Sequence, residues 1–191
     1  GYSGRVVALR IVPNVGRDIA PFLTEFGAEL VAGYEFIGHV HTKKSWHSQN
    51  RKAIERWQQY LQASLLGVDQ WGMADRILSA MLEDSQIGIV FPDDPKVLGW
   101  DNNYALAQEL ALGLGIATLP LHFNFPVGNM FWVRAEVLRP FVDLELAWED
   151  YPLEPLAKDA SMLHALERLF GVVPQVMGKM CAVSTVHGMT R

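Results

Sequence analysis

The stretch YEFIGHVHTKKS, residues 34–45, changes character halfway along its length. Its first half is mainly apolar and contains aromatic and β-branched residues, which is typical of a strand in a hydrophobic core. Its second half contains His41, Thr42 and the adjacent Lys43 and Lys44. Because side chains on a strand alternate between its two faces, only one of the two lysines should point inward. The stretch therefore predicts a buried strand that delivers polar and cationic side chains to one end of a sheet.

Strand-like and helix-like segments alternate around this stretch. The strand candidates are residues 5–12, 34–41, 87–92 and 128–135, with an edge strand within 175–185. The helix candidates are residues 18–31, 51–67, 71–83, 101–115, 135–141 and 158–171. Asp18 is placed to cap the first of these helices, and Asp159 and Gly171 would begin and end the last one. This order predicts an α/β domain with a largely parallel or mixed sheet, in which ligands collect beyond the carboxyl ends of strands.

Composition and charge are consistent with one folded domain over residues 1–191. Half of the residues are hydrophobic and 19% are charged, which argues against disorder. The net charge of −5 argues against a nucleic-acid partner, although a local pocket for one anion is compatible with it. Cys181 is the only cysteine, so no internal disulfide forms, and no apolar run is long enough to span a bilayer. Because the chain enters a strand almost at once, without a signal-peptide pattern, we expect a fragment of a longer protein.

Several motifs resemble those of the rhamnan synthesis protein F family, whose members are bacterial glycosyltransferase-like proteins that build rhamnose-containing cell-surface polysaccharides. The motifs are VPNVGRDIAPFL (12–23), HTKKS (41–45), LLG (65–67), GNMFW (128–132) and LHALERL (163–169). The resemblance extends from about Val6 to Phe170. It implies the GT-A plan of nucleotide-sugar transferases, a mixed or parallel sheet flanked by helices, with the first nucleotide-binding strand missing ahead of Gly1.

The GT-A comparison also implies roles for particular segments. Asn14 and Gly16 match a turn that precedes a helix, and the HTKK residues 41–44 occupy the position of an Asp-x-Asp metal site. The strand over 128–134 matches the one that shapes the acceptor side. Because the acidic metal ligands are absent, the resemblance implies no cofactor and leaves a divalent metal as an open alternative.

Lysines can replace a metal ion beside a leaving diphosphate. Two unit charges about 4 Å apart attract by roughly 4 kcal/mol at an effective dielectric constant near 20, so ammonium groups in a partly dry site would stabilise the departing group. Lys43 is the catalytic candidate because it should share the face of His41. The other donor-binding candidates are Asn14, Gly16, Arg17, Asp18, His41, Thr42 and Lys44. A plain helix cap for Asp18 and solvated loop positions for the lysines remain alternatives.

Asp150 is the candidate general base, since Glu149 and Asp150 match the acidic pair of the GT-A plan. A carboxylate beside Trp148 and Tyr151 would be partly desolvated and able to accept a proton from a sugar hydroxyl. The acceptor or sugar-binding candidates are Trp100, Asp101, Asn102, Gly128, Asn129, Trp132, Glu149, His164 and Arg168. An acidic surface loop, core aromatic residues and a structural arginine are the corresponding alternatives. We interpret Asp93 and Asp94 as an ordinary turn.

The predicted function is transfer of a sugar, rhamnose from deoxythymidine diphosphate (dTDP)-rhamnose, onto a lipid-linked, growing cell-surface polysaccharide such as a rhamnan, O-antigen or capsule. The expected mechanism inverts the anomeric carbon, and the expected location is the cytoplasm, peripheral to the inner membrane. A non-catalytic nucleotide-sugar or glycan-binding domain of a larger assembly protein is the main alternative. A metal-dependent hydrolase is another, in which His39 and His41 bind zinc together with His47, His122 or an aspartate.

Overall fold

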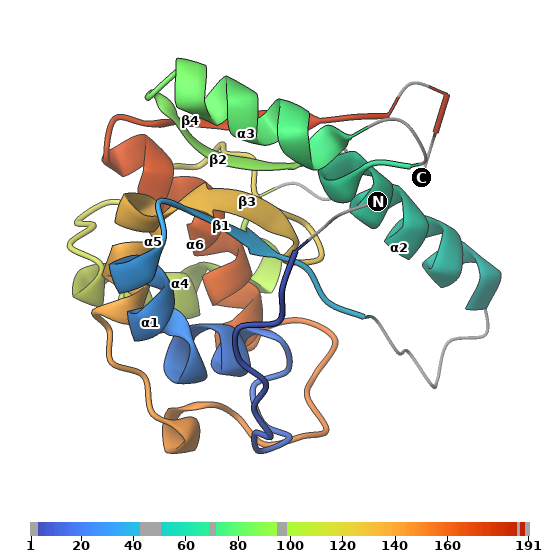
Figure 1. Ribbon diagram of the computed structural model, residues 1–191. Helices are drawn as coiled ribbons and strands as arrows, with labels where there is room; N and C mark the ends of the chain where they lie inside the picture. The colour runs from blue at the N-terminus through green and yellow to red at the C-terminus, as the bar shows by residue number, and fades with distance from the viewer. Residues whose placement is uncertain (1–3, 43–50, 69–71, 95–98, 187, 190–191) are drawn as a thin grey trace.

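A computed structural model describes residues 4–42, 51–68, 72–94, 99–186 and 188–189 of the chain. These residues form one four-stranded sheet with helices on both faces (Figure 1). The strands are β1 (Phe36–His39), β2 (Ile87–Pro92), β3 (Phe131–Arg134) and β4 (Met180–Ser184). The helices are η1 (Pro21–Glu25), α1 (Gly27–Gly33), α2 (Arg51–Leu66), α3 (Met73–Glu83), η2 (Asp101–Asn103), α4 (Tyr104–Gly113), α5 (Ala135–Val142), η3 (Trp148–Asp150) and α6 (Met162–Val176).

The sheet is mixed, as the alternating pattern predicts. Its strand order is β1-β3-β2-β4. β3 is antiparallel to both of its neighbours, with His39 opposite Phe131 and Val90 opposite Trp132, whereas β2 and β4 are parallel. The α/β class is therefore confirmed.

The two faces of the sheet carry separate cores. Residues of η1, α1, α4, α5 and α6 pack on one face, where Phe131, Leu166 and Phe170 are almost completely buried. Residues of α2 and α3 pack on the other face against Val90 and Met130. Burying one leucine or phenylalanine side chain contributes about 1.5–3 kcal/mol, so these two layers hold the sheet between them.

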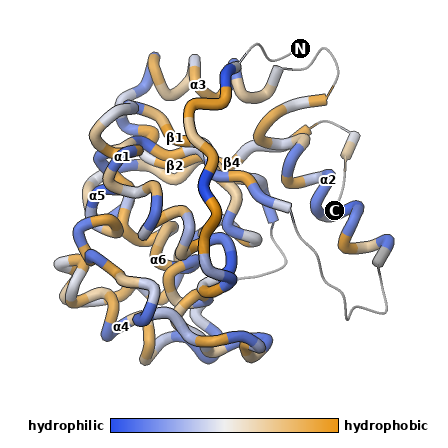
Figure 2. Tube along the Cα trace, turned by 60° about the horizontal axis from the view of Figure 1, so that its bottom comes forward, coloured by the Kyte–Doolittle hydropathy of each residue, from blue (hydrophilic) through white to orange (hydrophobic). Residues whose placement is uncertain are grey.

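The predicted strand over residues 5–12 is wrong. The segment has no strand partner within the part of the chain that the structure describes, and Val6, Leu9 and Ile11 are 85%, 91% and 102% exposed. Arg10 holds it against the body of the protein through ion pairs with Glu25 and Glu29. Figure 2 shows it as a mostly orange tube along the outside of the molecule. β-Branched residues favour a strand only when a neighbouring strand supplies hydrogen bonds and packing.

Two predicted helices differ from the observed ones. The helix expected over 18–31 is divided into η1 and α1, and η1 begins at Pro21 with Ala20 as its cap instead of Asp18. The last helix begins after Ser161 instead of Asp159, and it continues through Gly171 to Val176. Gly171 lies within α6 and does not end it. It lets the helix pack closely on the chain near Asn124, because a Cβ atom there would lie 2.0 Å from the carbonyl oxygen of Asn124.

Candidate functional site

Three chain segments meet at one edge of the sheet. Because β3 is antiparallel to β1 and β2, the beginning of β3 lies beside the ends of both neighbours. The segment after β1 carries His41 and Thr42, the segment after β2 carries Asp93 and Asp94, and Asn129 lies just before β3. The carboxyl ends of parallel strands are the usual place for ligands in α/β proteins. We therefore built the candidate site at this edge.

The Gly128–Asn129 turn is the centre of this edge. Both residues have left-handed backbone conformations, with φ values of 84° and 54°. A Cβ atom at Gly128 would lie 2.9 Å from Leu61 and 3.1 Å from the ring of Trp57, so only glycine fits there. Asparagine is among the few other residues that adopt a left-handed conformation readily. The backbone of this turn therefore requires glycine at position 128 and favours asparagine at position 129.

His39 and His41 both bind the main chain of this turn. The Nδ1 atom of His39 lies 2.7 Å from the carbonyl oxygen of Asn129, and the Nε2 atom of His41 lies 2.8 Å from that of Gly128. Because a carbonyl oxygen only accepts hydrogen bonds, both nitrogens carry a proton and donate. The two rings lie on one side of the strand, 5.7 Å apart. The histidines thus fasten the end of β1 to the beginning of β3.

His39 is a neutral core residue at physiological pH. Burial lowers the pKa of His39 from 6.5 to about 4, although the nearby negative charge of Asp18 partly opposes this effect. Its ring stacks on Phe22 at a centroid distance of 4.2 Å.

The geometry gives the metal-hydrolase alternative no support. The ring nitrogens that bind the Gly128–Asn129 turn are protonated, so these atoms cannot ligate zinc. Among the residues that the structure describes, no group of three or more histidine, cysteine, aspartate or glutamate side chains could hold a metal ion. His122 is exposed on the loop between α4 and β3, and His47 lies outside the described residues.

Asp18 joins the site instead of capping a helix. Its Oδ2 atom accepts a 2.6 Å hydrogen bond from Nδ2 of Asn129 and lies 3.6 Å from Nε2 of His41. η1 has no side-chain cap. Gly16, two residues earlier, has a φ of 67°, and a Cβ atom there would lie 2.4 Å from that of Ala20. This tight turn directs the Asp18 carboxylate toward the end of β1.

The remaining donor candidates are less closely connected to this centre. Asn14 and Arg17 are exposed, and Arg17 forms an ion pair with Glu154 at 3.3 Å. Thr42 is exposed at the end of the described segment. Lys43 and Lys44 lie outside the described residues, so their role stays a prediction.

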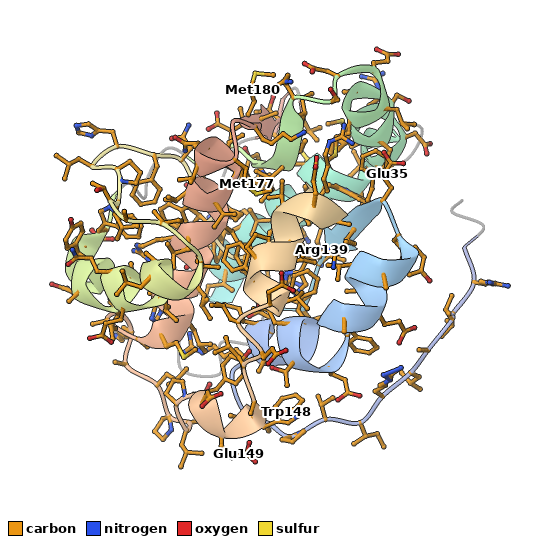
Figure 3. The ribbon with its side chains drawn as sticks, turned by 90° about the vertical axis from the view of Figure 1, so that its left-hand side faces the viewer. Glu35, Arg139, Trp148, Glu149, Met177 and Met180 are labelled. Atoms are coloured by element: carbon orange, nitrogen blue, oxygen red, sulfur yellow. The ribbon has the colours of Figure 1, made fainter. Side chains whose placement is uncertain are left out.

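The acidic pair Glu149–Asp150 lies in a short surface turn. The Oδ2 atom of Asp150 accepts a 2.8 Å hydrogen bond from the backbone N–H of Ala147, which stabilises η3. Both acidic residues are exposed, and Figure 3 shows Glu149 at the lower margin of the molecule. Tyr151 beside them is buried, with its hydroxyl 3.0 Å from that of Thr24. The role of Asp150 as a base remains a prediction.

A second cluster gathers five of the acceptor candidates around the start of α4 and of α6. Each makes a contact with another residue of the protein: Arg168 with Asp101 at 2.7 Å, Asn102 with Asp159 at 3.1 Å, Trp100 with the Pro120 carbonyl at 2.7 Å, and His164 with Ser161 at 2.7 Å. Arg168 is 4% exposed, which indicates a structural role. Its neighbour Glu167 connects this cluster to the sheet edge by accepting a 2.7 Å hydrogen bond from the Gly128 N–H.

Trp132 does not belong to either cluster. Its indole N–H donates to the carbonyl oxygen of Leu65, and a Cβ atom at Gly38 would lie 2.9 Å from its ring. It therefore packs between the sheet and α2, on the face opposite Phe131. The alternative of a core aromatic residue explains its position.

Sequence reasoning missed three contributors to the sheet edge. These are Glu167, Trp57 and Asp94, the last two joined by a 3.0 Å hydrogen bond from the indole N–H to the carboxylate. Asp94 is 8% exposed, whereas turn aspartates are usually in water. The position of Asp94 directly after a buried strand is a signal that could have identified it.

Comparisons with known proteins agree with the resemblance seen in the motifs. Two relatives, both described as uncharacterized protein WxcX, come from two strains of Xanthomonas campestris pv. campestris. Each is 30% identical over 182 residues, which is 93% of this chain and 25% of the relative. This chain thus spans about a quarter of the length of these relatives. No solved structure matches the chain significantly. The model of the rhamnan synthesis protein F family matches residues 2–178, and the chain therefore belongs to that family.

Proposed function

We propose that this chain transfers a sugar from a nucleoside-diphosphate donor to a growing cell-surface polysaccharide, with rhamnose from dTDP-rhamnose as the donor sugar. The observation that supports this most is the junction of His41, Asp18 and the Gly128–Asn129 turn at one sheet edge. The polypeptide that carries Lys43 and Lys44 continues directly from this junction. Family membership supports the link to polysaccharide synthesis.

The proposed chemistry divides between cations and a carboxylate. The donor diphosphate binds beside the HTKK residues, where Lys43 stabilises the charge that develops as the anomeric carbon–oxygen bond breaks. The acceptor hydroxyl attacks the anomeric carbon from the opposite side and gives its proton to Asp150. This direct displacement inverts the anomeric centre.

The proposed acceptor is a lipid-linked glycan on the cytoplasmic face of the inner membrane. No helix in the described portion has the length and apolarity needed to cross a membrane. In this proposal, the lipid of the acceptor holds the acceptor glycan at the membrane surface, where the protein meets it. The cluster around Trp100, Asn102 and His164 is the proposed acceptor side.

Calorimetric titration with a panel of nucleotide sugars, with and without divalent ions, tests the proposal. We expect dTDP-rhamnose to bind best and without added metal, and a Lys43→Ala/Lys44→Ala variant to lose at least tenfold in affinity. Matched changes of Lys52 and Lys158, which are exposed, should have little effect. Lack of binding to every donor would refute the proposal.

A non-catalytic donor-binding domain is the second candidate. The observation that favours it is the Asp150 carboxylate, which is exposed and bonded to its own turn. Transfer of labelled rhamnose to an acceptor separates the two functions. Turnover that disappears in Asp150→Asn supports catalysis, whereas donor binding without turnover supports the binding domain.

A further inference from the structure

We propose that Asn129 is a positioning residue that holds the Asp18 carboxylate at the donor site, and that it does not touch the sugar itself. This inference rests on the proposed function and changes one residue role within it, because the Gly-Asn motif alone predicts a sugar contact. Asp18 would then accept a hydrogen bond from a hydroxyl group of the donor.

The contacts of Asn129 point inward. Asn129 is 4% exposed, so little of its side chain is accessible to a ligand. Its Nδ2 atom donates to Oδ2 of Asp18 at 2.6 Å, and its carbonyl oxygen accepts from His39 at 2.7 Å. The carbonyl of Gly128 accepts from His41 at 2.8 Å. The turn therefore holds the end of β1 through both His39 and His41.

Asparagine is suited to this position for two separate reasons. The left-handed φ of 54° excludes most residues with a Cβ atom. The side-chain amide then supplies the N–H group that a carboxylate needs. Its Oδ1 atom is buried and has no hydrogen-bond partner among the described residues, so the amide acts here as a donor alone. Glycine would satisfy the first requirement and fail the second.

Asp18 is held by one oxygen and keeps the other for a ligand. Both described partners of its side chain, Asn129 and His41, approach Oδ2. The side chain is 19% exposed, so the Oδ1 atom can accept a hydrogen bond from a bound molecule. A carboxylate held in place by an amide loses little entropy on binding, which suits recognition of sugar or ribose hydroxyls.

A double-mutant cycle tests this inference. Asn129→Gly keeps the backbone conformation and both carbonyl acceptors and removes only the amide. We expect it to weaken dTDP-rhamnose binding about tenfold, as loss of a charge-assisted hydrogen bond does. Asp18→Ala should weaken binding at least as much, and adding Asn129→Gly to it should have no further effect. Additive losses would show that Asn129 contacts the donor directly and would overturn the inference, as would unchanged affinity of Asn129→Gly.

Asn103 provides a matched control for lost stability. It is buried, donates from Nδ2 to Asp159 at 2.6 Å and also has an unpartnered Oδ1 atom within the described region. Asn103→Ala should lower the unfolding midpoint while leaving donor affinity within twofold of the wild type. Equal loss of affinity in Asn103→Ala and Asn129→Gly would attribute the effect to general destabilisation and contradict the inference.

A structural readout separates this inference from the proposed function. The Cγ NMR signal of Asp18 should shift in Asn129→Gly and stay in place in Asn103→Ala. If the wild type binds no nucleotide sugar, the proposed function fails, and a shifted signal still supports the positioning of Asp18. An unchanged signal overturns the positioning role whatever the donor result.

Discussion

Acidification from pH 7.5 to pH 4 should destabilise this protein through His39. The unfolded histidine takes up a proton near pH 6.5, whereas burial lowers the pKa of the folded residue to about 4. Between these values the unfolded state binds more protons, so stability falls as the pH falls. The contribution is complete above about pH 6.5 and is lost as the pH approaches 4.

The magnitude follows from the difference between the two pKa values. Each pKa unit corresponds to about 1.36 kcal/mol, so the shift from 6.5 to about 4 is equivalent to about 3 kcal/mol. Asp18 and His41 are the titratable groups that face His39, with opposite effects on its pKa. The Asp159 carboxyl group titrates at a lower pH than His39 does. Burial raises its pKa, but hydrogen bonds from Asn103 and neighbouring groups outweigh this and lower it to about 2.

Urea unfolding at several pH values between 7.5 and 4 measures this contribution. His39→Asn is the comparison, since an asparagine amide can still donate to the Asn129 carbonyl and does not titrate. It will be less stable at pH 7.5 because it loses the stacking on Phe22. The wild type should nevertheless lose about 3 kcal/mol more than the variant as the pH falls. Parallel curves for the two proteins would refute the reasoning.

Two further substitutions and one thiol reaction test how buried residues contribute to the fold. Gly171→Ala should lower the free energy of unfolding in urea by at least about 3 kcal/mol, because its Cβ atom would lie 2.0 Å from the Asn124 carbonyl oxygen. Gly33→Ala is the control, because open space surrounds that position; it should be neutral or stabilising by about 0.5–1 kcal/mol. Arg168→Met should cost about 1–3 kcal/mol by the same measurement, because it removes the ion pair with the half-exposed Asp101 carboxylate and leaves the Gly99 carbonyl without its donor. Burial raises the pKa of the Cys181 thiol to about 11, so its reaction with a disulfide reagent at pH 8 should be at least about tenfold slower than in the urea-unfolded chain, and equal rates would contradict this.

The sequence predicts the class of fold because local patterns determine it. Residues 87–92 are apolar throughout, and β2 is buried on both faces as a central strand. The amphipathic spacing in residues 51–67 matches α2, whose Leu61 and Leu65 are fully buried. Residues 5–12 have an equally strand-like composition, and they have no strand partner among the residues described. Strand propensity is local, whereas strand pairing depends on a partner that the local sequence does not specify.

The candidate site is predictable where neighbours along the chain form it. Alternation along one strand is sufficient to place His39 and His41 on one face. The contact of Glu167 with Gly128 joins residues 39 positions apart, and that of Asp18 with Asn129 joins residues 111 positions apart. No periodicity encodes such contacts. Asp18 does not cap the helix as expected, because its carboxylate accepts a hydrogen bond from Asn129, which is distant in the sequence.

The histidines and the lysines of the HVHTKK stretch have different roles. Its histidines donate to the carbonyl groups of a left-handed turn, and those groups would otherwise be buried without partners. Imidazole meets this need without bringing a fixed charge into the core, which lysine could not do. Lys43 and Lys44 come later in the sequence than the two histidines that hold the end of β1. Loss of His39 should therefore lower stability first, and loss of Lys43 or Lys44 should lower donor binding with little effect on stability. Equal destabilisation by both kinds of change would mean that the lysines, too, have a structural role.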